Sequence, residues 1–162
     1  MRFIHYGHRC FDKEKFMPIQ NQECWNKPRG GFWASPVESE LGWKSWCEDN
    51  DFGECDEQNS VIFSLKPEAN IYHICSVEAA NNLPRSQSSY GINEMMPETP
   101  YSTIMGVDFE SMVKAGIDAI FYELSVCPQL YWKLYGWDCD CILVMNPDIV
   151  VPETASGEKE RT

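Results

Sequence analysis

The amino-acid sequence predicts an α+β fold with largely antiparallel strands. Short apolar runs typical of strands are mixed with segments of helical periodicity. Two of the runs, residues 61–65 and 71–75, lie too close together for a helical crossover, which favours antiparallel pairing. The 162 residues are 43% hydrophobic, enough for one core. We therefore expect a single domain over residues 1–151 and a disordered polar tail over residues 152–162.

Residues 2–7 are expected to form the first strand, followed by a loop-rich stretch over residues 9–30. Residues 31–35 form the second expected strand, which ends at a proline because proline cannot donate a ladder hydrogen bond. Residues 39–47 then fit a helix. Helical spacing gathers three large or apolar side chains of this segment on one face: Trp43, Trp46 and Cys47.

The middle of the chain contains two further strand-like runs, residues 60–65 and 70–75. Ser76 has the side chain to cap a short helix after the second run. Residues 81–103 are rich in Pro, Ser, Asn and Met and are expected to form a long loop. Loops of this length are uncommon in compact domains and often functional.

The C-terminal part begins with a helix capped by Asp108 and ended by a glycine at position 116. Residues 117–124 follow as a strand, and residues 128–136 as a helix with proline in its first turn. Residues 141–145 are the most apolar expected strand, closed by an Asn-Pro-Asp turn.

The formal net charge of −12 comes from 25 acidic and 13 basic residues. This charge disfavours direct nucleic-acid binding and contact with anionic membranes, whereas it could attract a basic partner. No apolar run approaches the roughly 20 residues of a membrane span, and the N-terminus lacks the apolar core of a signal peptide. We therefore expect a cytoplasmic protein whose eight cysteines are reduced thiols.

No pattern in the sequence marks a metal or phosphate site. There is no C-x-x-C pair, and neither the His5–Cys10 stretch nor Cys139-x-Cys141 has the spacing of a zinc knuckle. Glycine-rich phosphate loops are absent. A cysteine nucleophile remains an alternative because three histidines are present, but no local signature singles out one thiol.

Four separated patches carry rings, glycine, hydroxyl or carboxylate groups suited to a flat ligand. A glycine on a strand lets a ligand approach the backbone, aromatic rings can sandwich an amide ring, and a carboxylate can stabilise developing positive charge. Cleavage of a nicotinamide–ribose bond requires these three interactions. Trp33 and Ser35 alternate onto one face of their strand. The patches contain His5, Tyr6 and Gly7; Trp33 and Ser35; Trp43; and Asp138 and Asp140.

The order of these patches resembles the ADP-ribosyltransferase superfamily, whose members use a split antiparallel sheet with three spaced motifs. The first motif, a ring or Arg followed by Gly, is similar to Tyr6-Gly7 or to His5 displaced by one. The second, an aromatic with a small hydroxyl residue before a helix, resembles residues 33–35. The third, a carboxylate before an apolar run and an Asx-Pro pair, resembles residues 140–147.

The resemblance implies an ADP-ribosyltransferase-like split sheet and an NAD-dependent mono-ADP-ribosyltransferase-like enzyme acting on a macromolecular acceptor. NAD would be its substrate. The implied catalytic residues are Asp140, Asp138 and His5, and the implied NAD-binding residues are Tyr6, Gly7, Trp33, Ser35 and Trp43. The third motif has Asp where the family usually has Glu, and Glu123 is a further candidate.

A second hypothesis is an acidic, non-enzymatic module or inhibitor that occupies a basic, nucleic-acid-binding partner. Its basis is the pair of acidic clusters at residues 48–51 and 54–57.

Overall fold

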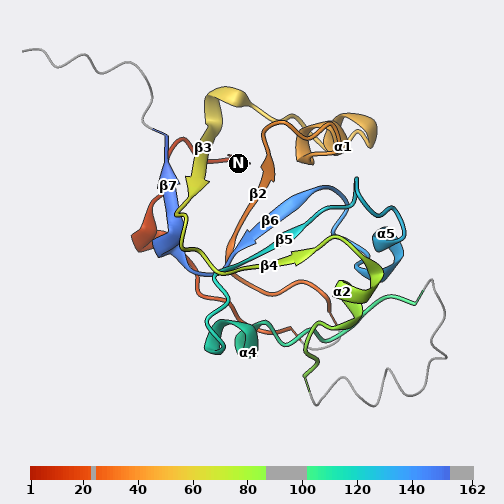
Figure 1. The fold of residues 1–162 in the computed structure, drawn as a ribbon. Helices are drawn as coiled ribbons and strands as arrows, with labels where there is room; N and C mark the ends of the chain where they lie inside the picture. The colour runs from red at the N-terminus through yellow and green to blue at the C-terminus, as the bar shows by residue number, and fades with distance from the viewer. Residues whose placement is uncertain (23–24, 87–101, 154–162) are drawn as a thin grey trace, which may run out of the picture.

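The computed structural model describes residues 1–22, 25–86 and 102–153. Within them, seven strands form one mixed sheet in the order β4-β5-β6-β2-β1-β3-β7 (Figure 1). Every neighbouring pair is antiparallel except β4–β5. The strands are β1 (Arg2–Tyr6), β2 (Phe32–Pro36), β3 (Ser60–Leu65), β4 (Ile71–Ile74), β5 (Ala119–Tyr122), β6 (Cys141–Val144) and β7 (Val150–Pro152).

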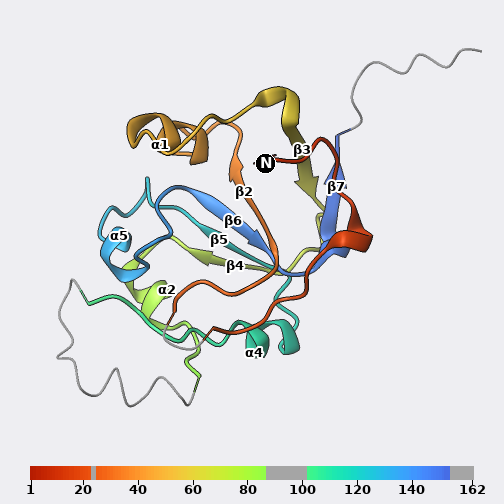
Figure 2. The same ribbon diagram turned by 180° about the vertical axis from the view of Figure 1, so that it is seen from behind.

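Short helices connect these strands and confirm the expected α+β class. They are α1 (Trp43–Asp49), α2 (Val77–Asn81), α4 (Phe109–Lys114) and α5 (Leu130–Lys133), with single 3-10 turns η1 (Lys13–Lys15), η2 (Glu57–Asn59) and η4 (Pro147–Ile149). In Figures 1 and 2, α1 lies at one end of β2, away from α2, α4 and α5. Ser76 and Asp108 cap α2 and α4 through their side chains, as their sequence positions indicate.

The largely antiparallel pairing is confirmed, but the two strands used to predict it do not pair with each other. β3 lies between β1 and β7, whereas β4 forms the opposite edge of the sheet, parallel to β5. The segment between β4 and β5 is long enough for a crossover that contains α2 and α4, which explains the parallel pair.

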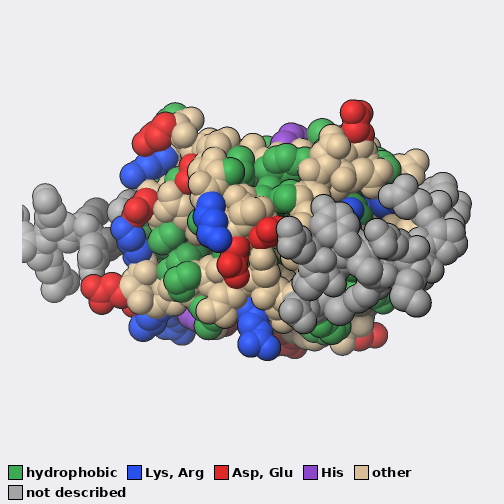
Figure 3. Space-filling model, turned by 90° about the horizontal axis from the view of Figure 1, so that it is seen from below, with side chains coloured by type: hydrophobic (Ala, Val, Ile, Leu, Met, Phe, Trp, Pro, Cys, Tyr) green, Lys and Arg blue, Asp and Glu red, His purple; other side chains and the backbone are tan. Residues whose placement is uncertain are grey.

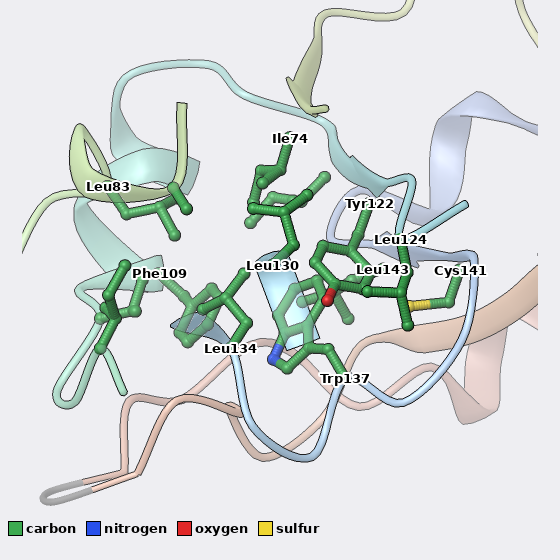
Figure 4. Close-up of a cluster of buried hydrophobic side chains, with 14 of the residues drawn as sticks. Ile74, Leu83, Phe109, Tyr122, Leu124, Leu130, Leu134, Trp137, Cys141 and Leu143 are labelled. Atoms are coloured by element: carbon green, nitrogen blue, oxygen red, sulfur yellow. The ribbon is translucent and has the colours of Figure 1, made fainter. Parts of the chain in front are cut away.

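Most of the core packs between the β4–β5–β6 part of the sheet and the helices α2, α4 and α5. Trp137 is 1% exposed at its centre, where its ring meets the edge of Tyr122 at 5.5 Å (Figure 4). A smaller cluster extends along the sheet and joins Phe3 of β1, Phe63 of β3 and Phe121 of β5 through their rings.

Several element boundaries differ from the sequence-based expectation. The helix expected from residue 39 begins at Trp43 because residues 39–42 form a turn, and the helix expected over residues 128–136 is reduced to α5. β7 was not among the expected strands. It includes Pro152, and the Glu153 N–H donates to the Ile62 carbonyl at 2.9 Å, so the ordered chain extends into the expected tail. Residues 154–162, and residues 87–101 of the expected loop, lie outside the described residues.

Candidate functional site

A cavity of about 300 Å³ opens where β1 and β2 part, which places it at the small end of the range for ligand pockets. The pairing of β1 with β2 comprises Phe3↔Pro36 and Ile4↔Ser35. In the same register His5 would face Ala34 and Tyr6 would face Trp33, but the pairing ends before these residues. The cavity brings together six of the eight residues singled out from the sequence: His5, Tyr6, Trp33, Ser35, Trp43 and Asp138.

His5 bridges the two strands at the point where they separate. Its Nδ1 lies 2.6 Å from the Trp33 carbonyl, which can only accept, so Nδ1 carries the proton and donates. The neutral ring then accepts at Nε2 from His8 Nδ1, 3.0 Å away. Burial lowers the pKa of His5, the Trp33 carbonyl opposes this shift, and His8 adds to it. Both nitrogens therefore have partners, and the ring packs on Phe32 with a centroid separation of 4.3 Å.

Trp33 and Trp43 supply the aromatic surface of the cavity. The Trp33 ring meets Trp137 edge-on at 4.8 Å, and the Lys27 ammonium lies 5.5 Å from the Trp33 ring centroid. Trp43 stacks on Trp46 with a centroid separation of 5.1 Å. These contacts fix the orientation of both indoles before any ligand enters, and preorganised rings lose little entropy on binding.

Ser35 connects β2 to the start of α1. It is 2% exposed, and its Oγ accepts the Trp43 N–H at 2.9 Å. The residue at the helix N-cap, Gly42, has no side chain to perform this task. The same Oγ lies 3.8 Å from the Cys139 sulfur. Ser35 therefore positions Trp43, and its hydroxyl is already engaged on two sides.

The two carboxylates implied by the third motif are placed in different surroundings. Asp138 is partly exposed and lines the cavity. Asp140 is 4% exposed and does not line this cavity. Its oxygens accept the Ser125 N–H at 2.8 Å, the Ser125 hydroxyl at 2.6 Å and the Ser39 hydroxyl at 2.8 Å. These bonds join the start of β6 to two loops, so the Asp140 carboxylate is a structural anchor in this conformation.

Asp140 also borders a broader, open hollow of about 950 Å³, together with Glu123, the further candidate carboxylate. Glu123 is paired with His73 of β4. Gly7, the remaining sequence candidate, is exposed with φ +109° and donates its N–H to the Asn59 carbonyl at 2.8 Å. Its positive φ suits glycine and turns the chain away after β1.

Lys27 and Cys139 also line the cavity; the sequence did not point to Lys27, and Cys139 was considered there only as a possible metal ligand. Lys27 is brought there by its neighbour Asn26, whose carbonyl accepts the Trp137 indole N–H at 2.9 Å and whose amide donates to the Tyr135 carbonyl at 2.7 Å. Nothing in the local sequence of this loop signals that contact. The sequence could have indicated that Cys139 lies near the cavity, because Cys139 directly follows Asp138, a candidate site residue.

A second hollow of about 510 Å³ adjoins the cavity and shares Ile4, Tyr6, Ser35 and Trp43 with it. Lys44 lies in this hollow and pairs with Glu57 at 2.6 Å. Burial raises the pKa of Tyr6, and the nearby Lys44 opposes that shift. The cavity and this hollow therefore share one wall, and together they are called the cleft below.

No family model, no curated protein and no solved structure matches this chain. In the described part of the chain, no three His, Cys, Asp or Glu side chains are grouped as they would be around a metal ion. None of the helices among the described residues has the length and apolar character needed to cross a bilayer. On the face shown in Figure 3, acidic and basic side chains are interspersed, without a continuous basic surface.

Proposed function

We propose that the protein is an NAD-dependent mono-ADP-ribosyltransferase-like enzyme, and that its seven-stranded sheet is of the ADP-ribosyltransferase type. The observation that carries the proposal is the meeting of β1, β2, α1 and the entry to β6 around one cavity. These segments are far apart in the sequence, and they contain the residues that resemble the superfamily motifs. The proposed substrate is NAD, and the proposed acceptor is a protein.

In this proposal the nicotinamide ring enters between Trp33 and Trp43, which offer flat apolar surfaces. Asp138, rather than Asp140, faces the ribose, because Asp138 lines the cavity and Asp140 is saturated by two serines. Cleavage of the nicotinamide–ribose bond develops positive charge on the sugar, which a carboxylate stabilises. His5 contributes by holding β2 against β1, and its Nε2 becomes available to a ligand only when His8 moves away.

Lys27 and Lys44 are the cationic groups of the cleft and are proposed to meet the pyrophosphate. The cavity between β1 and β2, about 300 Å³, suits the nicotinamide–ribose end alone. The rest of the dinucleotide is proposed to extend into the adjoining hollow. Lys44 would then exchange Glu57 for a phosphate, a modest cost for an exposed ion pair.

The test is calorimetric titration of the full chain with NAD, together with an assay for nicotinamide release. We expect saturable binding that Trp33→Ala weakens. Asp138→Asn is expected to retain binding and lose nicotinamide release, since the neutral amide cannot stabilise the cation. Absence of NAD binding at millimolar concentration would refute the proposal. Release that survives in Asp138→Asn would refute the role of Asp138 alone.

The acidic-module hypothesis is supported by a different observation. The carboxylate-bearing residues Glu48, Asp49, Asp51 and Glu54 are exposed at and after the end of α1. Capture of a basic protein by the wild type, lost when these four residues are neutralised and unaffected by NAD, would favour that function over the enzyme.

A further inference from the structure

Two cysteine thiols line the same cavity from one short segment. Cys139 and Cys141 both border it, whereas Asp140 between them turns to Ser39 and Ser125 on the other side. The two sulfurs are thus held on one face of the segment, and both belong to residues that are free thiols.

The surroundings make the two thiols unequal. Hydrogen bonding with Cys141 lowers the pKa of Cys139, Ser35 and Lys27 act in the same direction, and burial opposes them. Burial raises the pKa of Cys141. A thiol that forms the thiolate readily, next to one that stays protonated, is the arrangement of an attacking and a resolving cysteine.

Chain geometry permits a bond between them. Residues two apart on a strand have Cα atoms roughly 6.5 Å apart, near the upper end of the disulfide range of about 4.4–6.8 Å. The chain bends at residues 139 and 140, directly before β6 begins, and a bend cannot lengthen this separation beyond its extended value.

We infer that Cys139 and Cys141 form a peroxide-reactive dithiol in the cavity, with Cys139 as the attacking sulfur. Cys139 is 4% exposed, so the oxidant must be small enough to enter the cavity, as hydrogen peroxide is. This inference is independent of the proposed NAD reaction, since it concerns the protein's own thiols.

The chemistry balances in two steps. The Cys139 thiolate attacks one peroxide oxygen, the O–O bond breaks, and the hydroxide that leaves takes up a proton, giving a sulfenic acid and water. The Cys141 sulfur then attacks the Cys139 sulfur, the S–O bond breaks, and the departing hydroxide takes the Cys141 proton as a second water. Two thiols are oxidised to one disulfide and one peroxide is reduced to two waters.

Oxidation of the two thiols is expected to change the position of Trp43 at the start of α1 through the Ser35 hydroxyl. The Ser35 hydroxyl touches the Cys139 sulfur and also caps α1 at Trp43. Drawing the Cys139 sulfur toward Cys141 removes one of these contacts and frees the hydroxyl to turn. The orientation of Trp43 in the cavity would then report on the redox state.

The test is equimolar hydrogen peroxide added to the full-length reduced protein, followed by alkylation, intact mass measurement and peptide mapping. We expect loss of the mass of two hydrogens, with Cys139 and Cys141 protected from alkylation and linked to each other. Cys47 and Cys55, which share another cavity, provide the internal competitor. A bond between those two instead, or continued alkylation of both Cys139 and Cys141, would overturn the inference.

Variants separate the two roles. Cys141→Ala is expected to accumulate a Cys139 sulfenic acid that dimedone traps, and Cys139→Ala is expected to show neither trapping nor the disulfide. Cys10→Ala, which removes an exposed thiol, is the matched control and should oxidise like the wild type. If the Cys141→Ala protein shows no sulfenic acid at Cys139, the inference fails; the rate is not the criterion, because this variant also removes the hydrogen bond that most lowers the pKa of Cys139. The wild-type mapping decides the question even if a variant does not fold.

Discussion

Replacement of Asp140 by alanine tests whether this carboxylate supports the fold rather than the cavity. The side chain is 4% exposed and accepts three hydrogen bonds from Ser39 and Ser125. Hydrogen bonds to a charged group contribute about 1.5–3 kcal/mol each, but they are not additive, and the serine hydroxyls can turn to other acceptors. The Ser125 N–H cannot turn and is left without its partner. We therefore expect Asp140→Ala to lower the free energy of unfolding by about 2–4 kcal/mol.

The assay is guanidinium chloride unfolding followed by tryptophan fluorescence, with Asp138→Ala as the matched control. Asp138 is partly exposed, so its removal should change the free energy of unfolding by only about 0.5 kcal/mol. The midpoint of Asp140→Ala should fall at an unchanged m-value. A loss below about 1 kcal/mol for Asp140→Ala, or an equal loss for Asp138→Ala, would refute the assignment of Asp140 as an anchor.

Three further predictions follow from named contacts. Ser35→Ala removes the acceptor for the Trp43 N–H and should lower the free energy of unfolding by about 1 kcal/mol. The loss would be seen as a lower unfolding midpoint and altered Trp43 fluorescence, and an unchanged midpoint would contradict the capping role. Gly30→Ala places a Cβ 2.3 Å from the Pro18 carbonyl oxygen, whereas the Cβ of Gly116→Ala meets nothing within 4 Å. Only Gly30→Ala should therefore lower the free energy of unfolding by clearly more than the roughly 1–2 kcal/mol of left-handed strain. Equal losses of stability in the two variants would argue against the close approach at Gly30. The pKa of His5 is lowered in the folded protein, so its contribution to stability is complete above about pH 6.5 and is lost as the pH falls toward the folded pKa. The His5→Gln variant should therefore show a flatter stability–pH profile below about pH 6.5. An identical slope in the wild type and the variant would contradict this role of His5.

The sequence carried much of the fold because local patterns were strong. Strand runs such as residues 60–65 and the caps Ser76 and Asp108 depend mainly on short-range preferences. It did not reveal that β3 and β4 lie far apart in the sheet, because strand order depends on packing between distant segments. β7 was missed for the same reason, since its short run is stabilised by pairing with β3.

For the candidate site, the sequence alone determined which residue types were available, and alternation along a strand placed Trp33 and Ser35 on one face. Only the tertiary structure decided which carboxylate borders the cavity. Asp138 and Asp140 are the same residue type two positions apart. Serines on two other loops bind Asp140, whereas Asp138 lines the cavity beside the aromatic rings. For His5, the Trp33 carbonyl that engages Nδ1 is likewise remote, 28 residues along the chain, whereas His8, the partner of Nε2, is local. Contacts between distant segments, which no local pattern encodes, determine which carboxylate borders the cavity.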